Sequence, residues 1–287
     1  MARNSQYRRF TRSTAGSIGY FTILIVAGLF MVLPLYYCVV TSVKPLDELL
    51  IFPPKFFVQR PTFANFKALP SLLSNLQVPI SRYLFNTLFI TIVTTVSTII
   101  SGSMAAFAFS KSKVKGKNLM FNLVQMMLLY NGTTLAVPQY LIFSKMGIID
   151  SYWAYILPSI PSAVNCFLMK QFMDSSINDS LLEAARIDGA GVLGMYWRIV
   201  MPIMKPAWMT VLLFSFQTMW STVPGGTIFS EDLKTLPYVM SSVAAGGIAR
   251  QGSAMAITVI LMIPPILVFM FTQSNVMETM SSSGIKE

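Results

Sequence analysis

The chain has 287 residues, of which 54% are hydrophobic and only 11% are charged, and its formal net charge is +10. Soluble globular domains carry about 25% charged residues, so this composition excludes an ordinary soluble domain and indicates a membrane protein. The basic residues lie in short runs between long apolar stretches, as membrane topology requires. We therefore expect a lipid bilayer, and no nucleic acid, around this chain.

Six segments of at least nineteen residues contain no Asp, Glu, Lys or Arg. A helix needs about 20 predominantly apolar residues to cross the hydrocarbon core of a bilayer. The shorter charge-free segments 68–81 and 235–249 contain Pro or a Gly pair and are expected to be re-entrant or surface segments. The sequence thus predicts an all-α integral membrane protein with six transmembrane helices. The six predicted spans are 13–43, 83–110, 118–144, 151–169, 206–230 and 251–277.

Basic residues predict the orientation of these spans. Four arginines precede the first span within residues 3–12, and four lysines lie between the second and third spans within 111–117. Because Lys and Arg concentrate in cytoplasmic loops, we expect both termini in the cytoplasm. The loop 44–82 is also basic but is placed outside, since its charges are spread over a long segment. This predicts a cytoplasmic segment 1–12, a six-span domain 13–277 and a cytoplasmic tail 278–287.

The sequence lacks the usual signatures of catalysis and energy coupling. It contains no His, the commonest metal ligand and general base. Its one Gly-Lys pair, Gly116-Lys117, lacks the upstream glycine of a phosphate-binding loop. No carboxylate lies inside a predicted span, where a proton-coupled transporter normally needs one. We expect a chain that is not an enzyme and has no catalytic residue, metal site or cofactor of its own.

The long segment between the fourth and fifth predicted spans is expected to begin with a short helix. Ser180 and Glu183 have the spacing of a capping box. Leu181, Ala184 and Ala185 are expected on one helical face, at positions i, i+3 and i+4. Two small alanines on an exposed face would let the backbone of another protein approach closely.

A turn and a second helix are expected to follow. Gly189 and Gly191 should end the first helix, because glycine adopts a positive φ most easily. The second helix is expected over 192–200 and should end near Pro202. Together these elements predict a helix-turn-helix on the cytoplasmic side of the membrane.

The residues of this segment resemble the EAA loop of ATP-binding-cassette (ABC) importer permeases. The family pattern is E-A-A, three residues, G, nine residues and I-x-L-P. The chain has Glu183-Ala184-Ala185, then Gly189, then Ile199-Val200-Met201-Pro202, so every spacing matches and Met201 in place of Leu is the one departure. We call residues 178–206 the EAA loop. A solvated linker between two spans is the alternative interpretation.

Two further stretches are similar to the carbohydrate-importer branch of this family. They are Ile187-Asp188-Gly189-Ala190 within the EAA loop and Val137-Pro138-Gln139-Tyr140-Leu141 before the fourth span. A departure is Trp220-Ser221, where the family usually has Trp-Asn. The resemblance covers roughly residues 80–287.

The resemblance implies a permease subunit of an ABC importer in the bacterial cytoplasmic (inner) membrane. It implies a second homologous permease, two ATPase subunits that bind ATP and Mg²⁺, an external solute-binding protein and a sugar cargo as partners. Glu183 would pair with a basic residue of the ATPase, Gly189 would form the tight turn, and the alanines would allow a close fit. The residues implied in ATPase coupling are Glu183, Ala184, Ala185, Gly189, Ile199 and Pro202.

Cargo contacts are less closely defined by the sequence. Because amides and aromatic faces bind sugars, Asn131, Asn165 and Trp220 are candidates for the substrate pathway, with hydrogen bonding between helices as the alternative. The glycine-containing segment 225–250 resembles a loop that some sugar importers push towards their binding protein, and a plain surface loop is the alternative.

Two other functions stay open. The cargo could be an amino acid, a peptide or a phosphate ester, or the chain could be a passive channel or an ion-coupled carrier.

Overall fold

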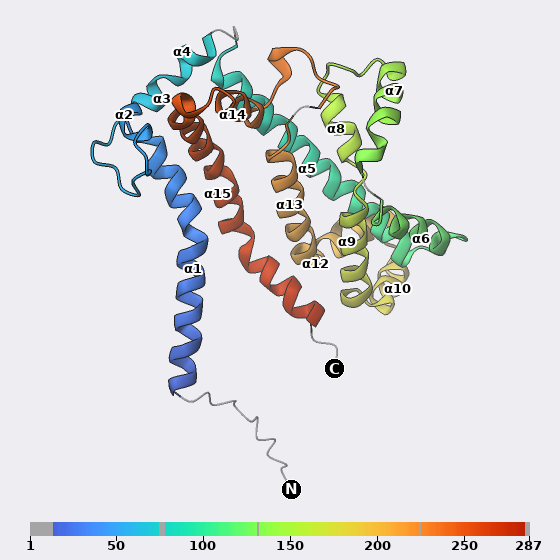
Figure 1. Cartoon of the computed structure of the whole chain (residues 1–287). Helices are drawn as coiled ribbons and strands as arrows, with labels where there is room; N and C mark the ends of the chain where they lie inside the picture. Colours follow the sequence, from blue (N-terminus) through green and yellow to red (C-terminus); the bar gives the residue numbers. More distant parts are fainter. Residues whose placement is uncertain (1–13, 75–77, 131, 224, 285–287) are drawn as a thin grey trace.

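The computed structural model describes residues 14–74, 78–130, 132–223 and 225–284, and within these ranges the regular secondary structure is entirely helical (Figure 1). Three helices in this part are long and apolar enough to cross a membrane. They correspond to the first, second and sixth predicted spans. They lie in α1 (Thr14–Ser42), α5 (Ile80–Lys111) and α15 (Gln251–Gly284).

The fifth predicted span, 206–230, contains α13 (Lys205–Trp220), which ends ten residues before the predicted end of the span. A sharp bend joins α13 to the second half of the EAA loop. Residues 192–203 and α13 are together long and apolar enough to cross a membrane, with an angle of 79° between them. The bend falls at Met204, directly before Lys205-Pro206. Because proline lacks an amide hydrogen, it is tolerated in the first turn of the new helix.

The third and fourth predicted spans are each divided into two helices. The third comprises α6 (Lys117–Met127) and α7 (Ala136–Met146), with the short η1 (Gly132–Leu135) before α7. The fourth comprises α8 (Trp153–Ser159) and α9 (Ala163–Ser176), which continues beyond the charge-free segment. None of these four helices alone has the length of a span, so six crossings remain a prediction.

Side chains of α5 satisfy the backbone at the break between α8 and α9. Pro161 lies at this break and cannot donate a hydrogen bond. The hydroxyl groups of Thr98 and Ser101 donate to the carbonyl oxygens of Ser159 and Ile160, at 3.1 and 3.2 Å. Such partners make irregular backbone tolerable inside a membrane protein.

The bundle is built around α5, which packs against α9 and α13, while α13 also packs against α15 and α15 against α1. Figure 1 shows the start of α1, the C-terminal end of α15 and the EAA-loop helices α10 (Asp179–Ile187) and α12 (Met201–Ile203) towards one end. These segments belong to, or directly adjoin, the parts of the chain that were predicted to be cytoplasmic, and the side of the membrane stays a prediction. The short helices α2 (Leu46–Leu49), α3 (Ala64–Lys67), α4 (Leu69–Ser74) and α14 (Leu236–Ala244) lie at the opposite end.

The predicted C-terminal tail partly continues the last helix. The structure extends α15 to Gly284, so residues 278–284 are helical rather than a separate tail. The predicted segment 1–12 lies outside the described residues.

Candidate functional site

The first helix of the EAA loop, α10, begins earlier than the sequence predicted. Asn178 is its N-cap, and the Asn178 side chain accepts a hydrogen bond from the backbone N–H of Ser180 at 3.3 Å. The predicted capping box of Ser180 and Glu183 is therefore wrong. Asn is among the strongest N-cap residues, so a cap at Asn178 adds a further half-turn to the helix.

The helix α10 buries one face and exposes the other. Leu182 is 2% exposed and Ala185 is 8% exposed, whereas Leu181, Glu183 and Ala184 are exposed. The predicted shared face of Leu181, Ala184 and Ala185 is thus divided, because consecutive helical residues point about 100° apart at 3.6 residues per turn. Ala184 is open to another protein, and Ala185 packs inside this chain.

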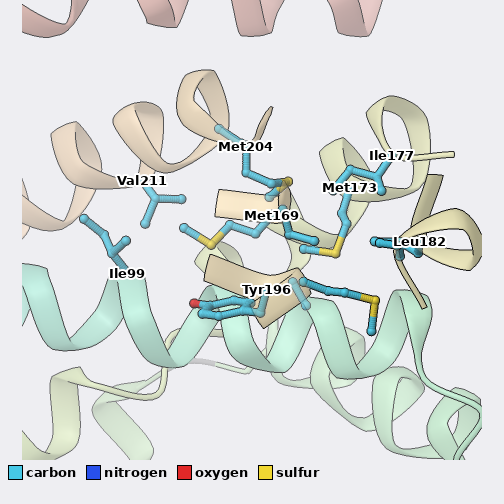
Figure 2. Close-up of a cluster of buried hydrophobic side chains, with 13 residues drawn as sticks. Ile99, Met169, Met173, Ile177, Leu182, Tyr196, Met204 and Val211 are labelled. Carbon is cyan, nitrogen blue, oxygen red and sulfur yellow. The ribbon is translucent and has the colours of Figure 1, made fainter. Parts of the chain in front are cut away.

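The buried face of α10 packs on a cluster of thirteen hydrophobic side chains (Figure 2). Figure 2 shows Leu182 pointing towards Met173, and Tyr196 lying along α5 near Met169. The cluster draws side chains from α5, α9, α10, α13 and the second half of the EAA loop. Burial of this kind contributes about 25 cal/mol per Å² of apolar surface, so the loop is held firmly on the bundle.

The turn after α10 has the geometry that the sequence predicted at Gly189. This residue has φ +82°, in the left-handed region. Its N–H donates to the Arg186 carbonyl at 3.0 Å, and the Ala190 N–H donates to the Ala185 carbonyl at 2.9 Å. These two bonds form a Schellman motif, which satisfies carbonyl groups at the helix end. Gly191 has φ −70° and is instead the N-cap of the next helix.

The second half of the EAA loop is helical over a longer stretch than predicted. It comprises α11 (Val192–Met195), the π-helical turn η2 (Tyr196–Val200) and α12. Ile199 is half-buried and packs against the hydrophobic cluster, whereas Pro202 is exposed. Of these two residues, Pro202 is the one whose side chain is open to a partner.

Polar contacts that the sequence did not reveal join the EAA loop to α5. The Lys111 ammonium group donates to the Ile177 carbonyl at 2.7 Å and to the Asp179 carboxylate at 2.8 Å. The hydrogen bond from Lys111 lowers the pKa of the Asp179 carboxyl below its usual value. These contacts bring the lysine run 111–117 to the same end of the bundle as the EAA loop, so the two features lie on the same side of any membrane.

An exposed apolar surface borders Glu183 and Ala184 on the EAA loop. Ile187 is 86% exposed, and Val192, Leu193 and Trp197 are also exposed. None of these residues belongs to one of the six predicted spans, and the predicted cytoplasmic position of the EAA loop would leave them outside the lipid. An exposed apolar patch outside the membrane indicates a protein contact. In the sequence, this surface is indicated by large apolar residues within a loop, at positions outside the buried face of α10.

The cargo candidates differ in their surroundings. Asn131 lies outside the described residues. Asn165 is 5% exposed and donates to the Ser215 hydroxyl at 2.8 Å. The indole N–H of Trp220 donates to the Leu261 carbonyl at 2.8 Å, and its ring stacks on Phe216. Asn165 and Trp220 therefore make the interhelical hydrogen bonds that the alternative interpretation expects.

The beginning of segment 225–250 is held in place by hydrogen bonds. The Asp150 carboxylate accepts from the backbone N–H groups of Phe229 and Ser230, at 2.9 and 2.8 Å. The Asn86 side chain donates to the carbonyls of Asp232 and Lys234, at 2.7 and 2.9 Å. This part of the segment is thus anchored to α5 and to the α7–α8 connection, which its glycine content did not suggest.

Residues 88–281 match the family described as the binding-protein-dependent transport system inner membrane component. The chain belongs to this family, whose members are permease subunits of ABC transporters.

Three curated relatives are informative. The polygalacturonan/rhamnogalacturonan transport system permease protein YtcP of Bacillus subtilis (strain 168) is 29% identical over 88% of this chain and 91% of the relative. The arabinooligosaccharides transport system permease protein AraQ of the same organism is 27% identical over 90% of this chain and 92% of the relative. The sn-glycerol-3-phosphate transport system permease protein UgpE of Yersinia enterocolitica is 27% identical, over 87% and 90%.

A solved structure supports the fold. A chain of a bacterial ABC transporter involved in the import of the acidic polysaccharide alginate superposes with a TM-score of 0.76. The match covers 92% of this chain and 98% of that chain, at 22% sequence identity.

Proposed function

We propose that this chain forms, with a second homologous permease, the translocation pathway of an ABC importer for a sugar or oligosaccharide. An external solute-binding protein delivers the cargo, and two separate ATPase subunits bind ATP and Mg²⁺. Family membership supports the permease role, and the names of two relatives support a sugar as cargo. The observation that carries the coupling role is the EAA loop, which is fixed on the bundle and exposes Ala184 beside an apolar surface.

The EAA loop couples ATP hydrolysis to transport by docking on an ATPase subunit. A ligand shifts a conformational equilibrium only through contacts that differ between the two states, so a loosely attached loop could not transmit force. Lys111 and the hydrophobic cluster attach this loop to α5, α9 and α13. Closure of the two ATPases on ATP then moves these helices with the loop.

In this proposal the six coupling residues fall into three groups according to their burial and backbone conformation. Glu183, Ala184 and Pro202 are exposed and contact the ATPase directly. Ala185 and Ile199 pack inside the chain and support the docking surface from below. Gly189 shapes the turn between the two helices, where its left-handed backbone ends α10.

The proposal includes the membrane topology of the chain. Six crossings place both termini and the EAA loop in the cytoplasm of a bacterial cell, and two of the crossings are broken helices, α6–α7 and α8–α9. The shared end of the lysine run and the EAA loop supports this arrangement. The positive-inside rule gives the side of the membrane.

A phosphate ester is the competing cargo, because one relative is named for sn-glycerol-3-phosphate. Uptake assays with short arabinan and galacturonan oligosaccharides and with glycerol phosphate, in the assembly reconstituted with its binding protein, distinguish these cargoes. Uptake that proceeds without ATP would instead identify a channel or an ion-coupled carrier.

The coupling role is tested with Glu183→Ala and the matched control Asp188→Asn. Both acids lie on the EAA loop, both are exposed, and only Glu183 is a defined position of the E-A-A pattern. Loss of a shielded charge-assisted hydrogen bond costs about 1.5–3 kcal/mol. Glu183→Ala should therefore reduce ATPase co-purification and ATP-dependent uptake at unchanged permease abundance, whereas Asp188→Asn should not. Normal co-purification and uptake with Glu183→Ala would show that the loop is a plain linker.

A further inference from the structure

Two open cavities of the helical bundle share lining residues at the C-terminal end of α8, next to the break between α8 and α9. The inner cavity has a volume of about 460 Å³ and lies between α5, the α8–α9 break and α13. The outer cavity has a volume of about 450 Å³ and lies between α7, α8 and the segment around Gly225 and Gly226. Pro158 and Ser159 line both cavities.

We propose that a polyhydroxylated cargo passes along this chain through these two cavities, with Pro158 and Ser159 at their junction and Thr94 as a hydrogen-bonding residue of the inner cavity. The proposal rests on the proposed import function and assigns a route within this subunit. The earlier sequence candidates included Asn165, which lines the inner cavity, and Trp220, which lines neither of these two cavities.

The inner cavity has the chemistry of a site for neutral hydroxyl groups. Eight of its thirteen lining residues carry a hydroxyl or amide group, and none is charged. Most ligand sites combine apolar walls with a few directed polar groups, and here Phe214 and Met219 supply apolar wall. The Gln217 side chain is exposed in this structure and adds an amide that can both donate and accept.

Thr94 is a lining residue of the inner cavity whose hydroxyl is both buried and unpaired. Its side chain is 1% exposed, and its hydroxyl has no hydrogen-bond partner within the described structure. By contrast, the neighbouring lining groups Thr98 and Asn165 are bonded to the Ser159 carbonyl and the Ser215 hydroxyl. Burying an unpaired hydroxyl is unfavourable, so we expect this group to gain a partner in another state of the transporter. The Thr94 hydroxyl is shielded from solvent in this structure, and in the proposal it bonds cargo when the cavity opens during transport.

The position of the cavities supports a pathway rather than an isolated pocket. Thr94 lies near the middle of α5, and discontinuous helices near the midplane are where transporters place their substrate sites. The outer cavity presents the exposed ring of Tyr140 and the amide of Gln139, which are suited to a sugar face and its hydroxyls. It lies towards the α14 end of the bundle (Figure 1), from which the binding protein delivers cargo in the proposed topology.

The test uses a matched pair of buried threonines on α5. Thr95 is 5% exposed and also has an unpaired hydroxyl, but it does not line the cavity. Cysteines are placed singly at positions 94, 95 and 217 of the complete reconstituted assembly, after replacement of Cys38 and Cys166. Each variant is treated with 2-aminoethyl methanethiosulfonate, with and without ATP and vanadate. The exposed position 217 provides a reporter whose substitution does not disturb packing.

In at least one nucleotide state, the cysteines at 94 and 217 should react at least about tenfold faster than the cysteine at 95. The cysteine at 95 lies outside the cavity and should react only through local opening of the structure. Oligosaccharide that the wild type transports should slow the reactions at 94 and 217. Equal rates at 94 and 95, in an assembly that transports, would overturn the proposed route while leaving the import function intact. Absence of ATP-dependent uptake by the wild type would instead contradict the proposed function.

The isosteric substitution Thr94→Val gives a second readout. It removes the hydroxyl without opening space, so the resting structure should be at least as stable as the wild type. Loss of one neutral hydrogen bond to cargo should weaken apparent affinity in uptake roughly three- to tenfold, whereas Thr95→Val should leave it unchanged. Equal effects of the two substitutions on uptake would contradict a cargo contact at Thr94.

Discussion

The hydroxyl oxygens of Tyr196 and Ser103 lie 2.6 Å apart in a buried contact between the EAA loop and α5. Ser103 also lies 2.7 Å from the Ile99 carbonyl, to which it donates its single proton. Tyr196 is therefore the donor to Ser103. This hydrogen bond and the Lys111 contacts bind the loop to α5 at two places. In the proposed coupling, a displacement of the loop by the ATPase would therefore act directly on the helix that carries Thr94.

Substitutions at this contact should have unequal effects. Ser103→Ala leaves the buried Tyr196 hydroxyl without a partner and should cost about 1–3 kcal/mol of stability. Tyr196→Phe leaves Ser103 bonded to Ile99 and should cost only about 0.5–1.5 kcal/mol. Thermal unfolding of the purified permease measures both. A larger loss for Tyr196→Phe than for Ser103→Ala would contradict the donor assignment.

Two glycines of the EAA loop should respond to alanine with opposite signs. A Cβ at either Gly189 or Gly194 would meet no heavy atom within 4 Å, so the difference is one of backbone conformation. Gly189→Ala forces an alanine to φ +82° and should cost about 1–2 kcal/mol. Gly194 lies within α11, where alanine should stabilise the helix by about 0.5–1 kcal/mol. Thermal unfolding and ATPase co-purification would be measured together, and equal shifts for both variants would exclude a role of the left-handed turn.

Local signals in the sequence predicted the parts of this site that depend on few neighbouring residues. The left-handed turn at Gly189 follows from glycine chemistry, and α1, α5 and α15 follow from long charge-free segments. The predicted start of α10 was wrong because Ser180 matched a capping pattern, whereas the helix begins after Asn178, an equally good cap two residues earlier. A local sequence pattern does not show which of two good N-cap residues begins the helix.

The remaining features depend on contacts between distant segments. Ala185 is buried in a cluster that includes residues of α9 and of the second half of the EAA loop, and the sequence of α10 alone does not reveal that face. The break between α8 and α9 is stable because Thr98 and Ser101 of another helix bond the freed carbonyls. Such tertiary partners are invisible to a count of charge-free residues, which therefore predicted one continuous span.

The carboxylate of Asp150 should control the order of the segment 227–230. Its pKa lies below the ordinary value, chiefly because the Ser230 side chain donates a hydrogen bond to it. Since the folded pKa is lowered, the stabilisation is present above the unfolded value of about 3.9 and is lost as the pH falls through the folded pKa. Hydrogen-exchange protection of Phe229 and Ser230, corrected for intrinsic rates, should therefore be constant near neutral pH and fall in acid.

Asp150→Asn provides the matched variant for this pH dependence. Asn also tolerates the left-handed conformation that Asp150 adopts, at φ +57°, so the backbone should be kept while the charge is removed. Protection of Phe229 and Ser230 should decrease at neutral pH and lose its acid transition. Asp232→Asn, a change to another exposed acid at the same end of the bundle, should leave both unchanged. An acid transition that persists in Asp150→Asn would assign it to a different group.

Membrane sidedness is tested by labelling single cysteines in intact cells. Val114 is 63% exposed and lies in the lysine run that packs beside the EAA loop, whereas Lys55 is exposed at the α2 end of the bundle. With Cys38 and Cys166 replaced, an impermeant maleimide should label Lys55→Cys and should label Val114→Cys only after the membrane is permeabilised. The permeabilised sample controls for reactivity at Val114→Cys, since failure to react there would reflect burial rather than sidedness. Labelling of Val114→Cys in intact cells, with protection of Lys55→Cys, would place the EAA loop outside the cell, where no ATPase could reach it.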